Sequence, residues 1–306
     1  MADPTARNRV AILKNESSLR WQSKLVLLVT MPFAGAGALL QLHWWANNLP
    51  NVALWAGGLS VLLGLAAWKL RTATAWAAAS GVVIAAGLAC STAVYPYSPW
   101  HTALVPLLAL LTLTALCTRI GRARKERLGI AEKRRGRSAS QVAANLGVPV
   151  LVLSEIAQTS LAGSHWFLMD ASLTLPLFAV GLAALAESAA DTVSSELGQV
   201  FGGSPRMITT LRVVEPGTDG AVSVAGTAFG IASAGVVAFV GAWALRGGAE
   251  MFWVAAAGGV FGLLFDSLLG ATLEREGWLN NDAVNFLSTA SAAAFSLVLL
   301  ALIARG

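Results

Sequence analysis

Long apolar stretches, separated by short polar segments, are the dominant pattern along the chain. Each stretch is close to the roughly 20 apolar residues that a helix needs to cross a bilayer core of about 30 Å. The spacing predicts nine membrane-spanning helices, over residues 25–45, 52–68, 75–95, 102–118, 142–161, 173–194, 222–245, 251–271 and 283–304. The preceding segment, residues 1–24, is polar and basic, which is typical of a cytoplasmic leader and not of a cleavable signal peptide.

The composition supports this interpretation. Hydrophobic residues make up 56% of the 306 residues and charged residues only 12%, about half of the roughly 25% charged share of a soluble domain. A water-soluble globule could not cover its surface with so few charges. We therefore expect an all-α polytopic membrane protein.

The cysteine, histidine and charge content excludes several classes of function. Cys90 and Cys117 both lie in apolar stretches, which excludes a disulfide scaffold and a zinc cluster. The three histidines are scattered, so a histidine-based metal site or catalytic triad is not expected. The net charge of +5 does not indicate a nucleic-acid partner, because the basic residues border apolar stretches instead of covering a soluble face.

The positions of Lys and Arg predict the orientation. With a cytoplasmic N-terminus and nine spans, all 21 basic residues except Arg246 and Arg305 fall on the cytoplasmic side. Such an excess is typical of cytoplasmic loops. We expect the C-terminus on the opposite side of a bacterial or archaeal inner membrane.

This topology divides the chain into a leader, a four-helix membrane part, a basic cytoplasmic loop and a five-helix catalytic core. The core is expected to carry the functional site, because it alone has ionisable residues well inside its spans, where they are costly and usually face a bundle interior. The four parts are residues 1–24, 25–118, 119–140 and 141–306, the last with cytoplasmic loops 195–221 and 272–282.

Polar side chains recur at helical spacing near the cytoplasmic ends of the core spans. Arg137, Gln141 and Asn145 follow one another at intervals of four, so they share a helix face. Glu187 and Asp191 form a similar stripe on the next span. These stripes predict a polar site at one depth of the cytoplasmic leaflet.

Two further segments reach the same depth. Asp266 lies near the cytoplasmic end of one span, and Asp282 and Asn285 open the last one. Glu155 is different because it lies deeper in the membrane. We expect it to hydrogen-bond to Ser154, Gln158 or a neighbouring helix and to have no catalytic role.

The convergent carboxylates suit a divalent cation. Magnesium takes one or two carboxylates together with water and phosphate oxygens. We expect Mg²⁺ as the cofactor, with the metal ligands Asp191, Asp266, Glu187 and Asp282.

The loop between spans 173–194 and 222–245 suits phosphate. Its glycines and threonines can present amides and hydroxyls, and a helix N-terminus follows, while arginines can pair with phosphate bidentately. The expected catalytic residues are Asp191, Asp266 and Arg137. The expected phosphate- and nucleotide-binding residues are Arg206, Arg212, Gly217, Thr218, Gly220, Ser223, Asn145, Gln141, Asn281 and Asn285.

Three interpretations stay open at this point. Metal, arginines and amides together are the equipment of phosphoryl transfer, which depends on positioning and charge neutralisation. Carboxylates within spans could equally couple ions in a transporter or flippase of a lipid phosphate or another anionic metabolite. Glycine-rich turns beside a basic loop are also common without any such role.

Several blocks of sequence resemble a known membrane family. The family is called domain of unknown function ninety-two, or transmembrane protein nineteen, and the resemblance covers residues 105–306 well. The blocks are the basic run 118–125, RSASQVAAN at 137–145, ADTVSSELG at 190–198, PGTDGAVS at 216–223, FDSLLGA at 265–271 and NNDAVNF at 280–286. The chain departs from the family at Leu146 and Ala221, where Gly is usual, and at Glu274, where Gln is frequent.

The resemblance implies a specific activity. The best-understood members are the phytyl-phosphate kinases of vitamin E and phylloquinone synthesis, which convert an isoprenyl monophosphate to its diphosphate with a nucleoside triphosphate, CTP being the expected donor. It therefore implies a polyprenyl-phosphate kinase with three partners: a lipid monophosphate, a nucleoside triphosphate and the membrane lipids around it.

Overall fold

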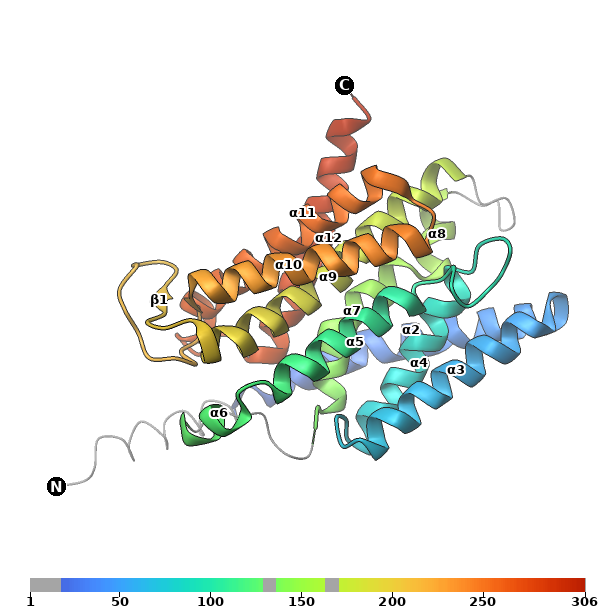
Figure 1. The fold of residues 1–306 in the computed structure, drawn as a ribbon. Helices are drawn as coiled ribbons and strands as arrows, with labels where there is room; N and C mark the ends of the chain where they lie inside the picture. The colour runs from blue at the N-terminus through green and yellow to red at the C-terminus, as the bar shows by residue number, and fades with distance from the viewer. Residues whose placement is uncertain (1–17, 129–135, 163–170, 306) are drawn as a thin grey trace.

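The computed structural model describes residues 18–128, 136–162 and 171–305 as a bundle of long apolar helices (Figure 1). Residues 1–17 of the expected leader and residues 129–135 of the basic loop lie outside this description, as do residues 163–170. The elements are α2 (Arg20–Asn48), α3 (Pro50–Lys69), α4 (Ala75–Ser91), α5 (Leu104–Arg119), α6 (Arg122–Leu128), α7 (Ala139–Val152), α8 (Glu155–Ala162), α9 (Ala171–Phe201), β1 (Arg206–Met207), β2 (Ala221–Val222), α10 (Val224–Ala244), α11 (Gly248–Leu269), the π-helical turn η1 (Gly270–Glu274) and α12 (Asn281–Ile303).

The helical membrane architecture expected from the sequence is confirmed. Within the described residues, seven helical segments are long and apolar enough to cross a membrane, one of which, Ala139–Gln158, joins α7 to the start of α8. The stretches 75–95 and 102–118 form α4 and α5, which have 17 and 16 residues and so rise about 24–26 Å at 1.5 Å per residue. These two are shorter than a full crossing, so the count of nine spans stays a prediction.

Some helix boundaries differ from the expected ones. The span expected over 142–161 is divided into α7 and α8, because the Ser154 hydroxyl accepts a hydrogen bond from the Ala157 amide at 3.2 Å and so begins a new helix. Helix α2 begins at Arg20, inside the expected leader. Helix α9 continues to Phe201, so the first part of the loop expected over 195–221 is helical.

Helix α9 is the central helix of the bundle. It packs against α5, α7, α10, α11 and α12. In its most apolar part, within Pro176–Phe201, 83% of the residues are buried. Small residues allow this close packing. A Cβ atom added to Gly241 of α10 would lie 2.2 Å from Leu182, and one added to Gly259 of α11 would lie 2.9 Å from Ala186.

The earlier helices form a second layer beside this group. Helices α2, α3 and α4 pack on one another, and α7 joins them to α9 and α12. Helix α5 belongs to the segment 25–118 in sequence, but it packs mainly against α9 and α10. The core around α9 therefore includes a helix from the N-terminal part of the chain.

One end of the bundle gathers the basic segments, and we call it the basic end. The start of α7 lies beside the start of α4 there, since the Arg137 amide donates to Thr72 O at 3.0 Å. The start of α12 lies beside α2, because Asn280 Nδ2 donates to Leu19 O at 2.9 Å. Members of this end include Arg71, Arg119, Arg137, Arg206, Arg212 and Arg275.

The opposite end is closed by other contacts. Trp45 Nε1 donates to Cys90 O at 3.1 Å, which ties the ends of α2 and α4 together. The Nδ1 atom of His101, which precedes α5, lies 3.1 Å from Ala244 O at the end of α10. This antiparallel order is the one that alternating membrane crossings require.

Candidate functional site

The basic end brings together the helix ends that the sequence singled out. At this end α9 packs against α7, α11 and α12. The segment 202–223, which carries β1 and β2 and which we call the rim, lies against η1. Gly220 closes the rim against η1: its φ is +73°, and a Cβ there would lie 2.2 Å from the Ala271 amide nitrogen. A glycine is required at this position.

Asp191 of α9 and Asp266 of α11 lie at the centre of this end. Their carboxyl groups are within hydrogen-bonding reach of each other, so the structure brings these two expected metal ligands together. The helices approach closely at this level because Gly262 of α11 has no side chain. A Cβ at Gly262 would lie 2.4 Å from Glu187 Cγ.

Arg137 supplies the positive charge that acts on Asp191. Its main chain is fixed on both sides, since its amide donates to Thr72 O and its carbonyl accepts from the Thr74 amide, both at 3.0 Å. Gly136 permits this contact, because a Cβ there would lie 2.5 Å from the Thr72 carbonyl carbon. The loop before α4 therefore positions the arginine over the carboxylates.

Glu187 lies one turn deeper on α9 and is only 1% exposed. Its charge interacts with Asp191, and its carboxyl group lies beside Ser288 of α12. Its Oε1 atom is buried without a hydrogen-bond partner, as is Asp266 Oδ2. Buried carboxylate oxygens are normally paired, so these two atoms are the positions in the cluster at which a ligand could bind.

Sequence reasoning missed two carboxylates near this cluster, Glu274 and Asp219. Glu274, at the end of η1, interacts electrostatically with both Asp191 and Asp219. A π-helical turn is often found at a functional site, and here it turns Glu274 toward the carboxylates. The signal that could have found it is its departure from the glutamine frequent in the resembled family.

The remaining expected residues of α7 and α12 surround this centre. Gln141 forms a capping box with Ser138: Gln141 Oε1 accepts from the Ser138 amide at 2.8 Å. Asn145 is partly buried and its carbonyl accepts from Ser188. Asp282, 8% exposed, lies in the first turn of α12, and the charges that act on Asp266 come from other carboxylates, those of Asp191, Glu187 and Glu274.

Two asparagines complete the expected residues of α12. Asn281 is exposed at the first position of the helix. Asn285 is partly buried one turn further on, and its carbonyl accepts from Ser288 Oγ at 3.0 Å. Asn285 is thus joined to the serine that lies beside Glu187 and Asp266.

The rim segment holds the other expected phosphate-binding residues. Arg206 and Arg212 are exposed, and Arg206 Nη1 donates to Leu211 O at 2.8 Å within the segment. Thr218 Oγ1 donates to Glu215 O at 2.7 Å. The other two expected rim residues are Gly217, whose φ of +85° marks a turn, and Ser223, whose hydroxyl accepts from the Gly226 amide and caps α10.

The carboxylates of this centre do not make a complete metal site by themselves. Within the described residues, no three His, Cys, Asp or Glu side chains are arranged to hold a metal ion. Magnesium commonly uses one or two carboxylates and completes its octahedron with water and phosphate oxygens. Asp191 and Asp266, with the unpartnered Asp266 Oδ2, could supply such a pair.

A buried ion pair fixes α9 just beyond the site. Lys125 of α6 pairs with Glu196 of α9 and also donates to Cys117 O at 3.1 Å. The Lys125 side chain is 2% exposed and that of Glu196 is 14% exposed. Arg124 Nη1 donates to Val200 O at 2.8 Å, near the end of α9. Part of the basic loop therefore contacts α9 directly and has a structural role.

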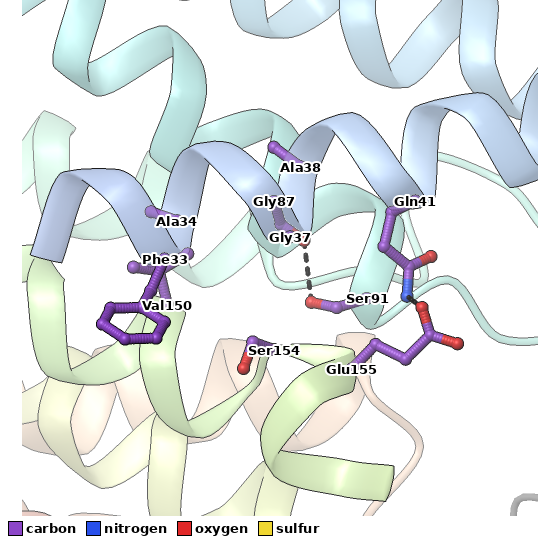
Figure 2. Close-up of a pocket in the computed structure, with 10 residues that line it drawn as sticks. All are labelled: Phe33, Ala34, Gly37, Ala38, Gln41, Gly87, Ser91, Val150, Ser154 and Glu155. Carbon is purple, nitrogen blue, oxygen red and sulfur yellow. Dashed lines mark hydrogen bonds between the residues drawn. The ribbon is translucent and has the colours of Figure 1, made fainter. Parts of the chain in front are cut away.

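Glu155 lies away from this cluster, in a small pocket between α2, α4 and the α7–α8 break (Figure 2). Gln41 Nε2 of α2 donates to Glu155 Oε2 at 2.5 Å, which confirms the expected bond to a neighbouring helix. Ser91, which also lines the pocket, donates to Gly87 O at 2.7 Å.

Comparison with known proteins places the chain among integral membrane proteins. The family model described as integral membrane protein DUF92 matches residues 58–293. An uncharacterized membrane protein of Methanocaldococcus jannaschii is 36% identical over 186 residues, which cover 61% of this chain and 71% of the relative. An uncharacterized membrane protein of Synechocystis is 34% identical over 202 residues, covering 65% of this chain and 73% of the relative.

A plant relative matches over a similar length. Protein VTE6, a chloroplastic protein of Arabidopsis thaliana, is 28% identical over 184 residues, which cover 59% of this chain and 53% of VTE6. No solved structure gives a significant match.

Proposed function

Because the chain belongs to the DUF92 family of integral membrane proteins, we propose that it is a membrane-embedded isoprenyl-phosphate kinase. In this proposal, an oxygen of a lipid monophosphate forms a new bond to the terminal phosphorus of a nucleoside triphosphate. The bond between that phosphorus and the bridging oxygen breaks, and the nucleoside diphosphate leaves. The lipid is of the phytyl or geranylgeranyl class and the donor is CTP, both following from the family resemblance.

One observation carries the proposal: the carboxylates of the basic end with their unpartnered oxygens. Asp191 and Asp266 lie within hydrogen-bonding reach, while Glu187 Oε1 and Asp266 Oδ2 are buried without partners. Carboxylates this close repel one another when ionised. A site bound to magnesium and phosphate relieves that repulsion and gives the unpartnered oxygens a ligand.

The residues of the chain would divide the work as follows. Asp191 and Asp266 would hold Mg²⁺, supported by Glu187 or Asp282, and the bound ion would neutralise charge on the phosphate oxygens. Arg137, fixed over Asp191, would hold the phosphates in line. Positioning of this kind is the main contribution that a protein makes to phosphoryl transfer.

The rim would receive the nucleotide from water. Arg206 and Arg212 are exposed there, and the turn at Gly217 lies in the same segment. Asn145, Asn281 and Asn285 would orient the reacting groups. Because basic segments gather at this end, we propose that it faces the cytoplasm, with the N-terminus on the same side, nine membrane crossings and the C-terminus on the opposite side.

A direct assay tests the proposal. The protein is purified in detergent and incubated with phytyl or geranylgeranyl monophosphate, Mg²⁺ and each of CTP, ATP, UTP and GTP, and lipid diphosphate is measured by mass spectrometry. We expect turnover with CTP that EDTA abolishes. Absence of lipid diphosphate with every nucleotide, alongside tight binding of the lipid monophosphate, would favour a carrier and contradict the kinase.

A further inference from the structure

Three phenyl rings stack in a row on the surface of α11 and α12, and we call them the phenyl row: Phe265, Phe261 and Phe295. The ring centroids of Phe261 and Phe265 are 6.1 Å apart with planes 11° from parallel. Those of Phe261 and Phe295 are 4.4 Å apart with planes 8° from parallel. Two helices thus contribute to one continuous aromatic surface.

The phenyl row begins at the same level of α11 as the carboxylate cluster. Phe265 is the residue before Asp266, and Phe261 lies about 7.5 Å from the Asp266 level at 1.5 Å per residue. On α12, Ser288 lies beside Asp266. Phe295 lies about 10.5 Å further along α12 by the same rise per residue. Because α12 runs away from the basic end, the row leads from the site toward the opposite face of the bundle.

The same surface faces lipid. Phe261 is 38% exposed, and its neighbours on α11, Leu264 and Leu268, are 43% and 41% exposed. Beside them the two helices meet at Gly262, where a Cβ would lie 2.8 Å from Ala292 Cβ. The row is therefore an apolar path that borders the α11–α12 contact and is open to the membrane.

We propose that the phenyl row binds the first isoprene units of the substrate's tail while the phosphate lies at Asp191 and Asp266. This inference rests on the proposed function. The flat, branched units of an isoprenyl chain make extensive van der Waals contact with ring faces. Binding energy from a part of the substrate remote from the phosphorus holds the phosphate in position.

The position of the row, at the level of the carboxylates on α11, distinguishes it from other aromatic surfaces. Phe239 of α10 and Phe252 of α11 also pair, but their planes are 84° apart. Phe252 lies about 21 Å along α11 from Asp266 at 1.5 Å per residue. An isoprenyl chain anchored at the carboxylates meets the phenyl row first, so the Phe239 pair provides a matched control.

Kinetics with monophosphates of two chain lengths provide the first test. In Phe261→Leu and Phe295→Leu we expect the KM for geranylgeranyl monophosphate to rise about tenfold, equivalent to about 1.4 kcal/mol, with kcat within twofold. The KM for a five-carbon monophosphate should change much less. The Phe239 side chain is 67% exposed, and Phe239→Leu should change the KM for neither monophosphate. Equal changes for both chain lengths, or the same change in Phe239→Leu, would overturn the proposal.

Photocrosslinking tests the inference independently of catalysis. Geranylgeranyl monophosphate carrying a diazirine near the phosphate is irradiated with the protein in nanodiscs without nucleotide, and the labelled residues are identified by mass spectrometry. We expect labelling of α11 and α12 at the phenyl row, competed by unlabelled geranylgeranyl monophosphate. Such labelling without turnover would support the tail site and contradict the kinase. Turnover with labelling elsewhere, or equal labelling by a diazirine phospholipid, would overturn the tail site.

Discussion

Ser188 donates its hydroxyl to the main-chain carbonyl of Asn145, at 2.6 Å, across the contact between α9 and α7. That carbonyl has no helical donor, because the residue four places later is Pro149, which has no amide hydrogen. The bond therefore satisfies a partly buried acceptor and joins α7 to α9 beside Glu187. It links the helix that follows Arg137 to the helix that carries Asp191.

Ser188→Ala removes this donor and leaves the Asn145 carbonyl without a partner. We expect the variant to lose about 1–2 kcal/mol of unfolding free energy, measured by thermal unfolding in detergent. Ser195→Ala is the matched control, since the exposed Ser195 hydroxyl donates to Thr192 O within its own helix, α9. An equal loss of unfolding free energy in both variants would contradict a stabilising role for the hydrogen bond between α7 and α9.

Asp191→Asn and Asp266→Asn test the proposed metal pair. Both replacements keep the side-chain shape and relieve repulsion among the carboxylates, so we expect normal folding and membrane insertion. Lipid diphosphate formation should fall by at least about a hundredfold, as expected when a group that neutralises transition-state charge is lost. Mg²⁺-dependent binding of the nucleotide, followed by calorimetry, should disappear. A misfolded variant that keeps its activity per folded molecule would identify a structural partner of Arg137 instead.

Gly262→Ala tests how closely α11 must approach α9. The added Cβ would lie 2.4 Å from Glu187 Cγ, so we expect a loss of about 1–3 kcal/mol from overpacking. We also expect reduced turnover, because Asp266 moves away from Asp191. Gly235→Ala on α10 is the control, since nothing lies within 4 Å of its Cβ position. Its unfolding temperature should be unchanged or slightly raised, and a parallel fall in both variants would contradict the argument.

Lys125→Met tests the ion pair that fixes α6 to α9. Loss of the lysine leaves Glu196 buried without its charge partner, which typically costs about 3–5 kcal/mol. The double variant Lys125→Met with Glu196→Gln should recover part of that loss in a double-mutant cycle. Glu126→Gln in the exposed Arg122 pair, whose side chains are 41% and 42% exposed, should cost less than about 1 kcal/mol. A cycle without coupling would contradict a structural role for Lys125.

The sequence alone determined the class of the protein and predicted the residues of its candidate site. Runs of apolar residues predict membrane helices because the bilayer core offers no water to the main chain. A helix satisfies its main-chain hydrogen bonds internally. Charges are costly in that environment, so Asp191 and Asp266 were recognisable as a site from their positions alone. The expected partner of Glu155 on a neighbouring helix followed from the same cost and is Gln41.

Only the tertiary structure decided which of these groups meet. Glu274 joins the cluster through a π-helical turn, while Asp282 lies in the first turn of α12. The division of 142–161 into α7 and α8 depends on a single serine cap, and the use of Gln141 in a capping box depends on local geometry. Hydropathy averages over whole turns and cannot resolve such events. The close approach of α9 and α11 depends on glycines such as Gly262, whose partners lie far away in the sequence. Distances across a bundle are set by packing between helices, and a pattern along one chain does not contain them.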